Sequence, residues 1–397
     1  MASSYGHDRC QPDGAERERE TGAQYASRPN ADVLWALEPA TAAKHRLYKR
    51  YLDAWWPILL QPRSRDGRLW PRVTYLDAFA GPGRYLGGEE GSPVFALQRL
   101  LCHDATGRMR LSRDRVRLLF MEKRRDRYEY LQGELERRFG GLDELPVWPE
   151  AYHAEAGAAA EGLLEKTSAW GHPILGVFDS WGNVNVPLRL IGRIAHNPAS
   201  EVIVTFGPNW FSRRENLQPD RLDVVFGGRK HWEPADHEQR TDERWRAWLA
   251  TYRAALGRAG FRFQLHFQIV PKTGQPLYLV YGTNHEKGVE VMKDAMWEVD
   301  GNDGMGFADP RTRGAPLPGQ EMLLWGGPKN PELLELVRQR LEDGPVSLAD
   351  LGHWLLVETA RWRAKDARPA VRDLLEMGAA SVDPVGKLTK ESVIRLR

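Results

Sequence analysis

Cysteine is scarce in this sequence, and long apolar runs are missing from it. The only cysteines among 397 residues are Cys10 and Cys102, too few for a disulfide framework or a cysteine-based zinc site. No window approaches the roughly 18 consecutive apolar residues of a membrane span. The N-terminal 20 residues lack the apolar stretch of a secretory signal. These absences predict a cytoplasmic protein without a membrane partner.

Several catalytic signatures are missing as well. Leu86 stands three positions after Gly83, where a dinucleotide fold would have a third glycine. The Gly-Lys-Ser/Thr ending of a P-loop and the Gly-x-Ser-x-Gly elbow of serine hydrolases do not occur. The histidines lack the short paired spacing of metal ligands, so we expect no metal.

Charge is nearly balanced, while tryptophan and arginine are in excess. The net charge is +2, so the protein has no global field that would attract nucleic acid. The chain has 15 tryptophans, and 44 arginines against 12 lysines. Stacking faces and guanidinium groups suit nucleic-acid binding. Core packing and a general arginine bias explain the same counts.

The chain begins with a polar segment and a helix. Residues 1–30 are polar and are interrupted by glycine and proline, which predicts a disordered tail. In the following segment, 31–70, apolar residues recur at helical spacing with Lys44 and other basic residues between them. We expect this helix to begin at Thr41 and to break at Pro57.

Strand and helix patterns alternate through residues 71–299. Short β-branched or aromatic runs occupy 73–79, 116–122, 174–179 and 201–206, with a weaker run at 145–150. A helical pattern at 242–259 precedes two apolar runs joined by Pro-Lys-Thr-Gly-Gln, which is typical of a hairpin. Alternation of this kind predicts an α/β fold with a mostly parallel sheet. Five parallel strands and a terminal hairpin match the Rossmann-like class I methyltransferase sheet.

The remaining sequence predicts a linker and a second domain. Residues 300–320 are rich in glycine and proline and have no periodicity, which is typical of a linker. Residues 321–397 contain three helical patterns followed by two short strands around a turn. We interpret this segment as a winged-helix-like domain.

Candidate ligand groups follow the first, second and fourth strands. Asp77 ends the first strand and is followed by Gly81 and Gly83, which allow the backbone to approach a cofactor closely. Glu122 ends the second strand, where a carboxylate can accept both hydroxyls of a ribose. A tight turn without a ligand and a solvated glutamate are the alternatives.

Asp179 and Trp181 follow the fourth strand. Carboxyl ends of parallel strands share one edge, so these side chains would flank the same crevice as Asp77. We predict that Asp179 holds the acceptor and that Trp181 provides a stacking wall. A tryptophan that closes the core beneath the loop is the alternative for Trp181.

Several segments together resemble the three-Cys-motif partner protein family (TcmP) over about residues 41 to 300. They are YLDAFAGPGRYLGGEEGSP, FMEK, FDSWGNVNVPLRLIGRI, YRAALGRAGF and PLYLVYGTNHEKGVEVM. The family resembles class I methyltransferases that use S-adenosylmethionine, and its members are named for a genomic partner protein of the radical type with three cysteines. The resemblance implies that S-adenosylmethionine binds at the positions of the cofactor motif, Asp77, Phe79, Ala80, Gly81, Gly83 and Glu122.

One departure bears on the chemistry. Nucleic-acid amino-methyltransferases carry Asp-Pro-Pro-Tyr after the fourth strand, whereas this chain has Asp179-Ser-Trp-Gly182. Loss of the proline relaxes the backbone there, which favours cofactor binding over adenine N6 chemistry. The first interpretation is a methyltransferase-like protein acting on or with nucleic acid. Alternatives are a non-catalytic scaffold that recruits a three-cysteine partner, and a regulator in which only the C-terminal domain binds DNA.

The C-terminal domain contains a basic stretch that leads into its third helix. A recognition helix of this kind would contact nucleic acid. The predicted contacts are Arg361, Arg363, Lys365, Arg368 and Arg372. Because the domain carries little net charge, docking to a protein is the alternative.

Overall fold

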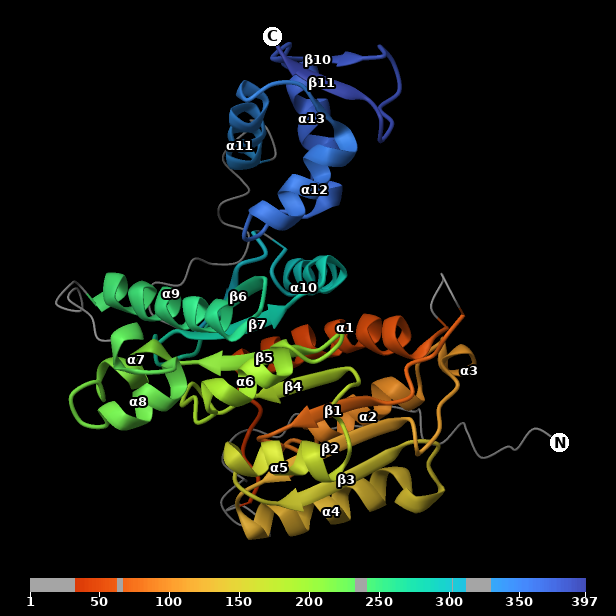
Figure 1. Ribbon diagram of the computed structural model, residues 1–397, viewed down its shortest axis with the longest axis vertical. Coiled ribbons are helices and arrows are strands. Elements are labelled where there is room, and N and C mark those ends of the chain that lie inside the picture. Colours follow the sequence, from red (N-terminus) through yellow and green to blue (C-terminus); the bar gives the residue numbers. More distant parts are fainter. Residues whose placement is uncertain (1–32, 63–66, 233–240, 302, 312–329) are drawn as a thin grey trace.

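The computed structural model describes residues 33–62, 67–232, 241–301, 303–311 and 330–397. The predicted tail, 1–30, lies outside the described residues. Figure 1 shows an α/β body with a smaller C-terminal module that stands on one side of it.

The body is built on an eight-stranded sheet. Its strands are β1 (Val73–Asp77), β2 (Val116–Glu122), β3 (Trp148–His153), β4 (Ile174–Phe178), β5 (Glu201–Phe206), β6 (Phe263–Val270), β7 (Leu277–Thr283) and β8 (Gly306–Ala308). Their order is β3-β2-β1-β4-β5-β7-β6-β8. The first five strands are parallel, and β7 is antiparallel to both β5 and β6. The predicted α/β fold with a mostly parallel sheet and an antiparallel hairpin is therefore confirmed, and β8 adds a further strand at the sheet edge.

Helices cover both faces of the sheet (Figure 1). One core contains residues of α1 (Pro39–Leu60), α2 (Ser92–Leu101), α4 (Arg125–Phe139) and α10 (Glu286–Val299). The other contains residues of α5 (Ala158–Lys166), α6 (Leu188–Ala195), α8 (Pro219–Phe226) and α9 (Thr241–Ala259). Strands β1, β4 and β5 are buried along their whole length, because both of their faces pack against helices.

Helix α1 differs from its predicted boundaries at both ends. It starts at Pro39, so Thr41 lies inside the first turns and is buried. It also continues through Pro57 to Leu60. Proline cannot donate to the carbonyl of Asp53, and the His103 Nε2 donates to that carbonyl at 2.8 Å instead. A partner from another element thus removes part of the cost of the proline.

A buried carboxylate fastens α1 to the sheet. Glu201, the first residue of β5, accepts hydrogen bonds from Tyr51 of α1, from the Tyr281 hydroxyl at 2.7 Å and from the Thr283 hydroxyl at 2.8 Å. Burial raises the pKa of Glu201 above its usual value. The three hydroxyls satisfy a group that would otherwise be costly to bury.

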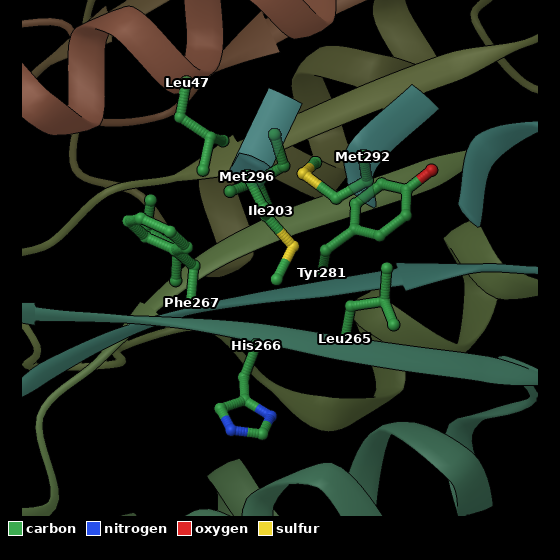
Figure 2. Close-up of a pocket in the computed structure, with 9 residues that line it drawn as sticks. Leu47, Ile203, Leu265, His266, Phe267, Tyr281, Met292 and Met296 are labelled. Carbon is green, nitrogen blue, oxygen red and sulfur yellow. The ribbon is translucent and has the colours of Figure 1, made fainter. Parts of the chain in front are cut away.

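A small apolar pocket lies between α1, α10 and the sheet (Figure 2). Its lining includes Leu47, Phe267, Met292 and Met296, whereas His266 points away on the other side of the sheet in Figure 2. The pocket therefore offers packing space rather than a reactive group.

The segment predicted as a linker contributes to the sheet. Residues 306–308 form β8, which pairs in parallel with β6. Asp300 accepts hydrogen bonds from the amides of Met305 and Gly306 and so shapes the turn before the strand. Residues 312–320 of the predicted linker lie outside the described residues.

The C-terminal module contains the three predicted helices and the predicted hairpin. The elements are α11 (Pro331–Glu342), β9 (Val346–Ser347), α12 (Leu348–Glu358), α13 (Ala367–Glu376), β10 (Ala380–Asp383) and β11 (Val393–Leu396). The short strand β9, which the sequence analysis missed, pairs with β11 and completes a three-stranded antiparallel sheet.

A buried lysine joins the module to the body. Lys293 of α10 is fully buried, and its ammonium donates to the carbonyls of Leu355, Leu356, Thr359 and Trp362 at 2.7–3.3 Å. Helix carbonyls near a C-terminus have no partner within the helix, so this ammonium caps the end of α12. Burial lowers the pKa of Lys293 to about 7.

No helix in the described part of the chain combines the length and hydropathy needed to cross a bilayer. Cys102 follows α2, and the other cysteine of the sequence, Cys10, lies outside the described residues.

Lys293→Met should loosen the junction between body and module. Because the carbonyls at the end of α12 lose their donor, we expect the free energy of unfolding to fall by about 2 kcal/mol in urea titrations. Amide hydrogen exchange should accelerate around Thr359 and Trp362. Lys287→Met, on the same helix but with a side chain 58% exposed, is the matched control and should change stability by less than about 0.5 kcal/mol. Equal stability of the two variants would contradict the capping role.

Candidate functional site

Three acidic residues lie along the carboxyl edge of the sheet. Asp77 ends β1, Glu122 ends β2, and Asp179 follows β4. Strand β1 lies between β2 and β4, with Asp77 in register with Phe120 and Val177. The sequence therefore placed all three residues correctly at one edge.

Asp77 is the most deeply buried of them, with 1% of its surface exposed. Its Oδ1 accepts a hydrogen bond from the Phe79 amide at 3.2 Å, and its Oδ2 is buried as well. Burial raises its pKa to about 7, although hydrogen bonds from the Ser92 side chain and the Phe79 amide act to lower this pKa. A buried carboxyl with a raised pKa at the end of a strand is a candidate ligand-binding group.

Glu122 is tied to the glycine loop. Its Oε2 accepts a hydrogen bond from the Gly81 amide at 3.0 Å, and its Oε1 accepts one from the Arg124 amide at 2.7 Å. Ala80 is buried and donates its amide to the carbonyl of Met121 at 2.9 Å. Each Glu122 oxygen retains a lone pair for a further donor.

The two glycines of the loop serve different needs. Both have positive φ, +66° at Gly81 and +80° at Gly83, a region that side chains rarely adopt. A Cβ on Gly83 would lie 2.8 Å from the Leu131 side chain, so this glycine permits packing against α4. A Cβ on Gly81 would meet only the ring of Trp35, at 3.4 Å. Phe79 is partly buried against the core that contains α5 and α6.

Trp35, which the sequence analysis did not select, covers the glycine loop. Its ring packs edge-on against Tyr85 with 5.7 Å between centroids, and the guanidinium of Arg127 lies 4.4 Å from its ring centre. Its carbonyl accepts a hydrogen bond from the Leu86 amide at 3.0 Å. The segment before α1 is therefore part of the site.

Asp179 is already engaged by α1. Lys44 Nζ lies 2.6 Å from one carboxylate oxygen and 2.8 Å from the other. The Thr205 hydroxyl donates to the carboxylate at 2.6 Å and the Tyr48 hydroxyl at 3.4 Å. Burial acts to raise the pKa of Asp179, but the Lys44 ammonium outweighs burial and holds this pKa below its usual value. Asp179 is thus ionised and fully partnered in this structure.

Trp181 does not close the core, because 54% of its surface is exposed. Its backbone adopts φ +55°, which is unusual for a bulky residue, and Lys44 Nζ lies 4.8 Å from its ring centre. The next residue, Gly182, packs closely on Gly207. A Cβ added to Gly182 would lie 2.8 Å from the Cα of Gly207. The loop after β4 therefore holds an aromatic face at the surface.

The C-terminal basic stretch divides into two groups. Arg361 pairs with Glu332 and lies 3.8 Å from Asp303, while Arg363 pairs with Asp366 at 2.7 Å. Lys365 pairs with Asp294 of α10 at 2.6 Å although it is largely exposed. Only the other two predicted contacts, Arg368 and Arg372, are exposed without a carboxylate within ion-pair distance in the described part of the chain.

The sequence did contain a signal for Lys44. Lys44 lies three residues before Leu47 and four before Tyr48, and all three are on the buried face of α1. A charge on the apolar face of a helix requires a partner, and Asp179 is that partner. Thr205 and Trp35 gave no such signal, because only the fold brings them to this edge.

Among the described residues, no three His, Cys, Asp or Glu side chains come together in a way that could hold a metal ion.

Comparison with known proteins finds likeness only in structure. The chain matches no protein-family model and no curated protein. One similar solved structure is EvdMO1, with 15% identity over 64% of this chain and 46% of that chain and a TM-score of 0.31. A second is the DszA carbon methyltransferase, with 14% identity over 62% of this chain and 59% of that chain and a TM-score of 0.32. Another is Trm1 from Pyrococcus horikoshii in complex with S-adenosyl-L-methionine. It has 13% identity over 92% of this chain and 92% of that chain, with a TM-score of 0.36. The chain spans less than two thirds of the length of EvdMO1 and DszA.

Lys44→Met should destabilise the protein strongly, because it leaves the Asp179 carboxylate without its counter-ion. Breaking one side of a buried ion pair costs about 3 kcal/mol or more. Lys49→Met, on the same helix, removes a more exposed partner of Glu90 and should cost at most about 1 kcal/mol. Urea titration measures both, and the double variant Lys44→Met/Asp179→Asn should recover part of the loss. A Lys44→Met loss no larger than that of Lys49→Met would contradict the pairing.

Proposed function

We propose that this protein is a methyltransferase-like protein that binds S-adenosylmethionine at the carboxyl edge of its sheet and acts on or with nucleic acid. The observation that carries the proposal is the buried carboxyl of Asp77 at the end of β1, next to the Gly81 loop that Glu122 holds.

The donor set suits this cofactor. S-adenosylmethionine carries positive charge, and two carboxylates at the end of β1 and β2 favour a cation there. The free lone pairs of Glu122 suit the paired hydroxyls of a ribose. Phe79, Ala80, Gly81 and Gly83 form the remaining cradle, with the Trp35 ring beside Gly81. When bound, the cofactor supplies an electrophilic methyl group.

On the acceptor side, the proposed catalytic residues are Asp179 and Trp181. Methyl transfer needs an acceptor aligned with the methyl group more than it needs covalent chemistry. The exposed face of Trp181 suits stacking on a planar acceptor. An acceptor amine that uses Asp179 has to share or displace Lys44.

Nucleic-acid contact through the C-terminal module also belongs to the proposal. Its element order, helix, strand, two helices and a hairpin, supports the winged-helix interpretation. Arg368 and Arg372 lie exposed on α13 and are the proposed contacts. Arg361, Arg363 and Lys365 instead pair with carboxylates. We propose that these ion pairs help to hold the module in place.

A second candidate is a non-catalytic scaffold that recruits a three-cysteine partner enzyme. The observation that favours it is the ion pair of Asp179 with Lys44, which already occupies the carboxylate that an acceptor would need. Cofactor binding without turnover, together with co-purification of such a partner, would support the scaffold over the enzyme.

Isothermal titration with S-adenosylmethionine tests the cofactor site. Gly81→Ala should weaken binding at least tenfold, because a side chain at φ +66° strains the loop that contacts the cofactor. Gly133→Ala, where an added Cβ meets nothing within 4 Å, is the matched control and should bind like the native chain. Absence of binding by the native chain would refute the proposal.

Binding should also depend on pH through Asp77. The pKa of this carboxyl is about 7, so it is mostly protonated below that pH and becomes a carboxylate above it. Affinity for the cationic cofactor should therefore rise between about pH 6 and pH 8. Asp77→Asn should abolish this rise, and an identical pH profile in the variant would assign the titration to another group.

A further inference from the structure

Three arginines beside the candidate site have no ion-pair partner among the described residues. Arg213 is exposed after α7 (Pro208–Ser212), Arg214 follows it, and Arg221 lies on α8. In the described part of the chain, none of the three has a carboxylate within ion-pair distance. Helices α7 and α8 lie at the end of the sheet where β5 finishes (Figure 1).

The neighbouring acidic residues are already used. Glu215 pairs with Arg244 of α9. Asp223 pairs with Arg229 at 3.1 Å, and Asp220 lies 3.7 Å from the same guanidinium. Within the described residues, therefore, no carboxylate pairs with Arg213, Arg214 or Arg221.

Trp210 orders two of these arginines. The guanidinium of Arg214 lies 4.5 Å from the Trp210 ring centre, and that of Arg221 lies 5.0 Å from it. The ring packs edge-on against buried Phe211, 4.8 Å between centroids, which fixes its orientation. Trp210 is thus a positioning residue that holds two cations in fixed places.

This basic cluster is joined to the loop of Trp181. Arg221 donates to the Asn183 side-chain oxygen at 3.3 Å. The Gly207 amide donates to the Gly182 carbonyl at 3.0 Å, so the loops after β4 and β5 touch through two glycines. The two loops in contact therefore carry an exposed indole on one and guanidinium groups packed on Trp210 after the other. We call the set Trp181, Arg213, Arg214 and Arg221 the acceptor rim.

We propose that the acceptor rim binds single-stranded nucleic acid, with Arg214 and Arg221 on backbone phosphates and Trp181 stacked on a base. The inference rests on the proposed function and names the substrate class of the same site. Guanidinium groups suit phosphate, and an exposed indole stacks on any unpaired base. A duplex keeps its base faces covered, and an acidic peptide offers charge without a stacking partner.

Fluorescence anisotropy with a fluorescein-labelled 12-nucleotide single strand, without cofactor, tests the rim in the full chain. Arg214→Ala/Arg221→Ala should weaken binding at least tenfold and reduce the slope of log affinity against log salt by about 1.4, for two phosphates lost. Trp181→Ala should weaken binding roughly tenfold and leave the salt slope unchanged. Titrating each variant also in an Arg368→Ala/Arg372→Ala background separates the rim from the C-terminal module.

Arg108→Ala is the matched control. Arg108 is exposed, precedes β2 at the opposite edge of the sheet and has no carboxylate within ion-pair distance in the described residues. Its loss lowers the net charge by one, half of the change in the double rim variant, and should change affinity less than twofold. Native affinity in the rim variants would overturn the inference. So would equal affinity for a 12-base-pair duplex, or full competition by an oligoglutamate peptide.

The same protein samples are titrated with S-adenosylmethionine. Rim-dependent strand binding in a chain that binds no cofactor would refute the cofactor proposal and leave the rim as a nucleic-acid site. Cofactor binding with rim-independent strand binding would refute the rim alone.

Discussion

The ion pair between Lys44 and Asp179 organises the candidate site. It joins the first helix to the end of β4, and it brings Tyr48 and Thr205 onto the same carboxylate. Because the pair is nearly buried, neither charge is tolerable without the other. It keeps Asp179 ionised, whereas neighbouring Asp77 is raised to a pKa of about 7. Two carboxyl groups at one edge thus differ in pKa because only one of them has a counter-ion.

The N-terminal segment is consequently part of the site rather than a flanking addition. Glu201 and its hydroxyl partners fasten the middle of α1 to the sheet, and Lys44 fastens its beginning. Trp35 then lies against Gly81 ahead of the helix. At the other end of the chain, Lys293 fixes the C-terminal module to α10 by the same means, a buried polar group satisfied across two elements.

The fold was largely predictable, since its strands are local patterns. The bounds of β2 and β5 agree with the sequence prediction, and Asp77, Glu122 and Asp179 lie at one edge because parallel strands place their ends together. Tertiary contacts decided the rest. His103 lets α1 pass through Pro57, and pairing with β6 turns part of a glycine-rich segment into β8. The sequence predicted Arg361 as a nucleic-acid contact because its acidic partners, Asp303 and Glu332, are distant from it in the sequence.

The central claim is that the edge formed by Asp77, Gly81 and Glu122 holds S-adenosylmethionine. The most direct measurement is mass spectrometry of small molecules released when the purified native chain is denatured, after incubation with the cofactor and removal of the excess. The account predicts near-stoichiometric recovery of S-adenosylmethionine or its demethylated product, and strongly reduced recovery from Gly81→Ala. Recovery of neither compound from the native chain would contradict it.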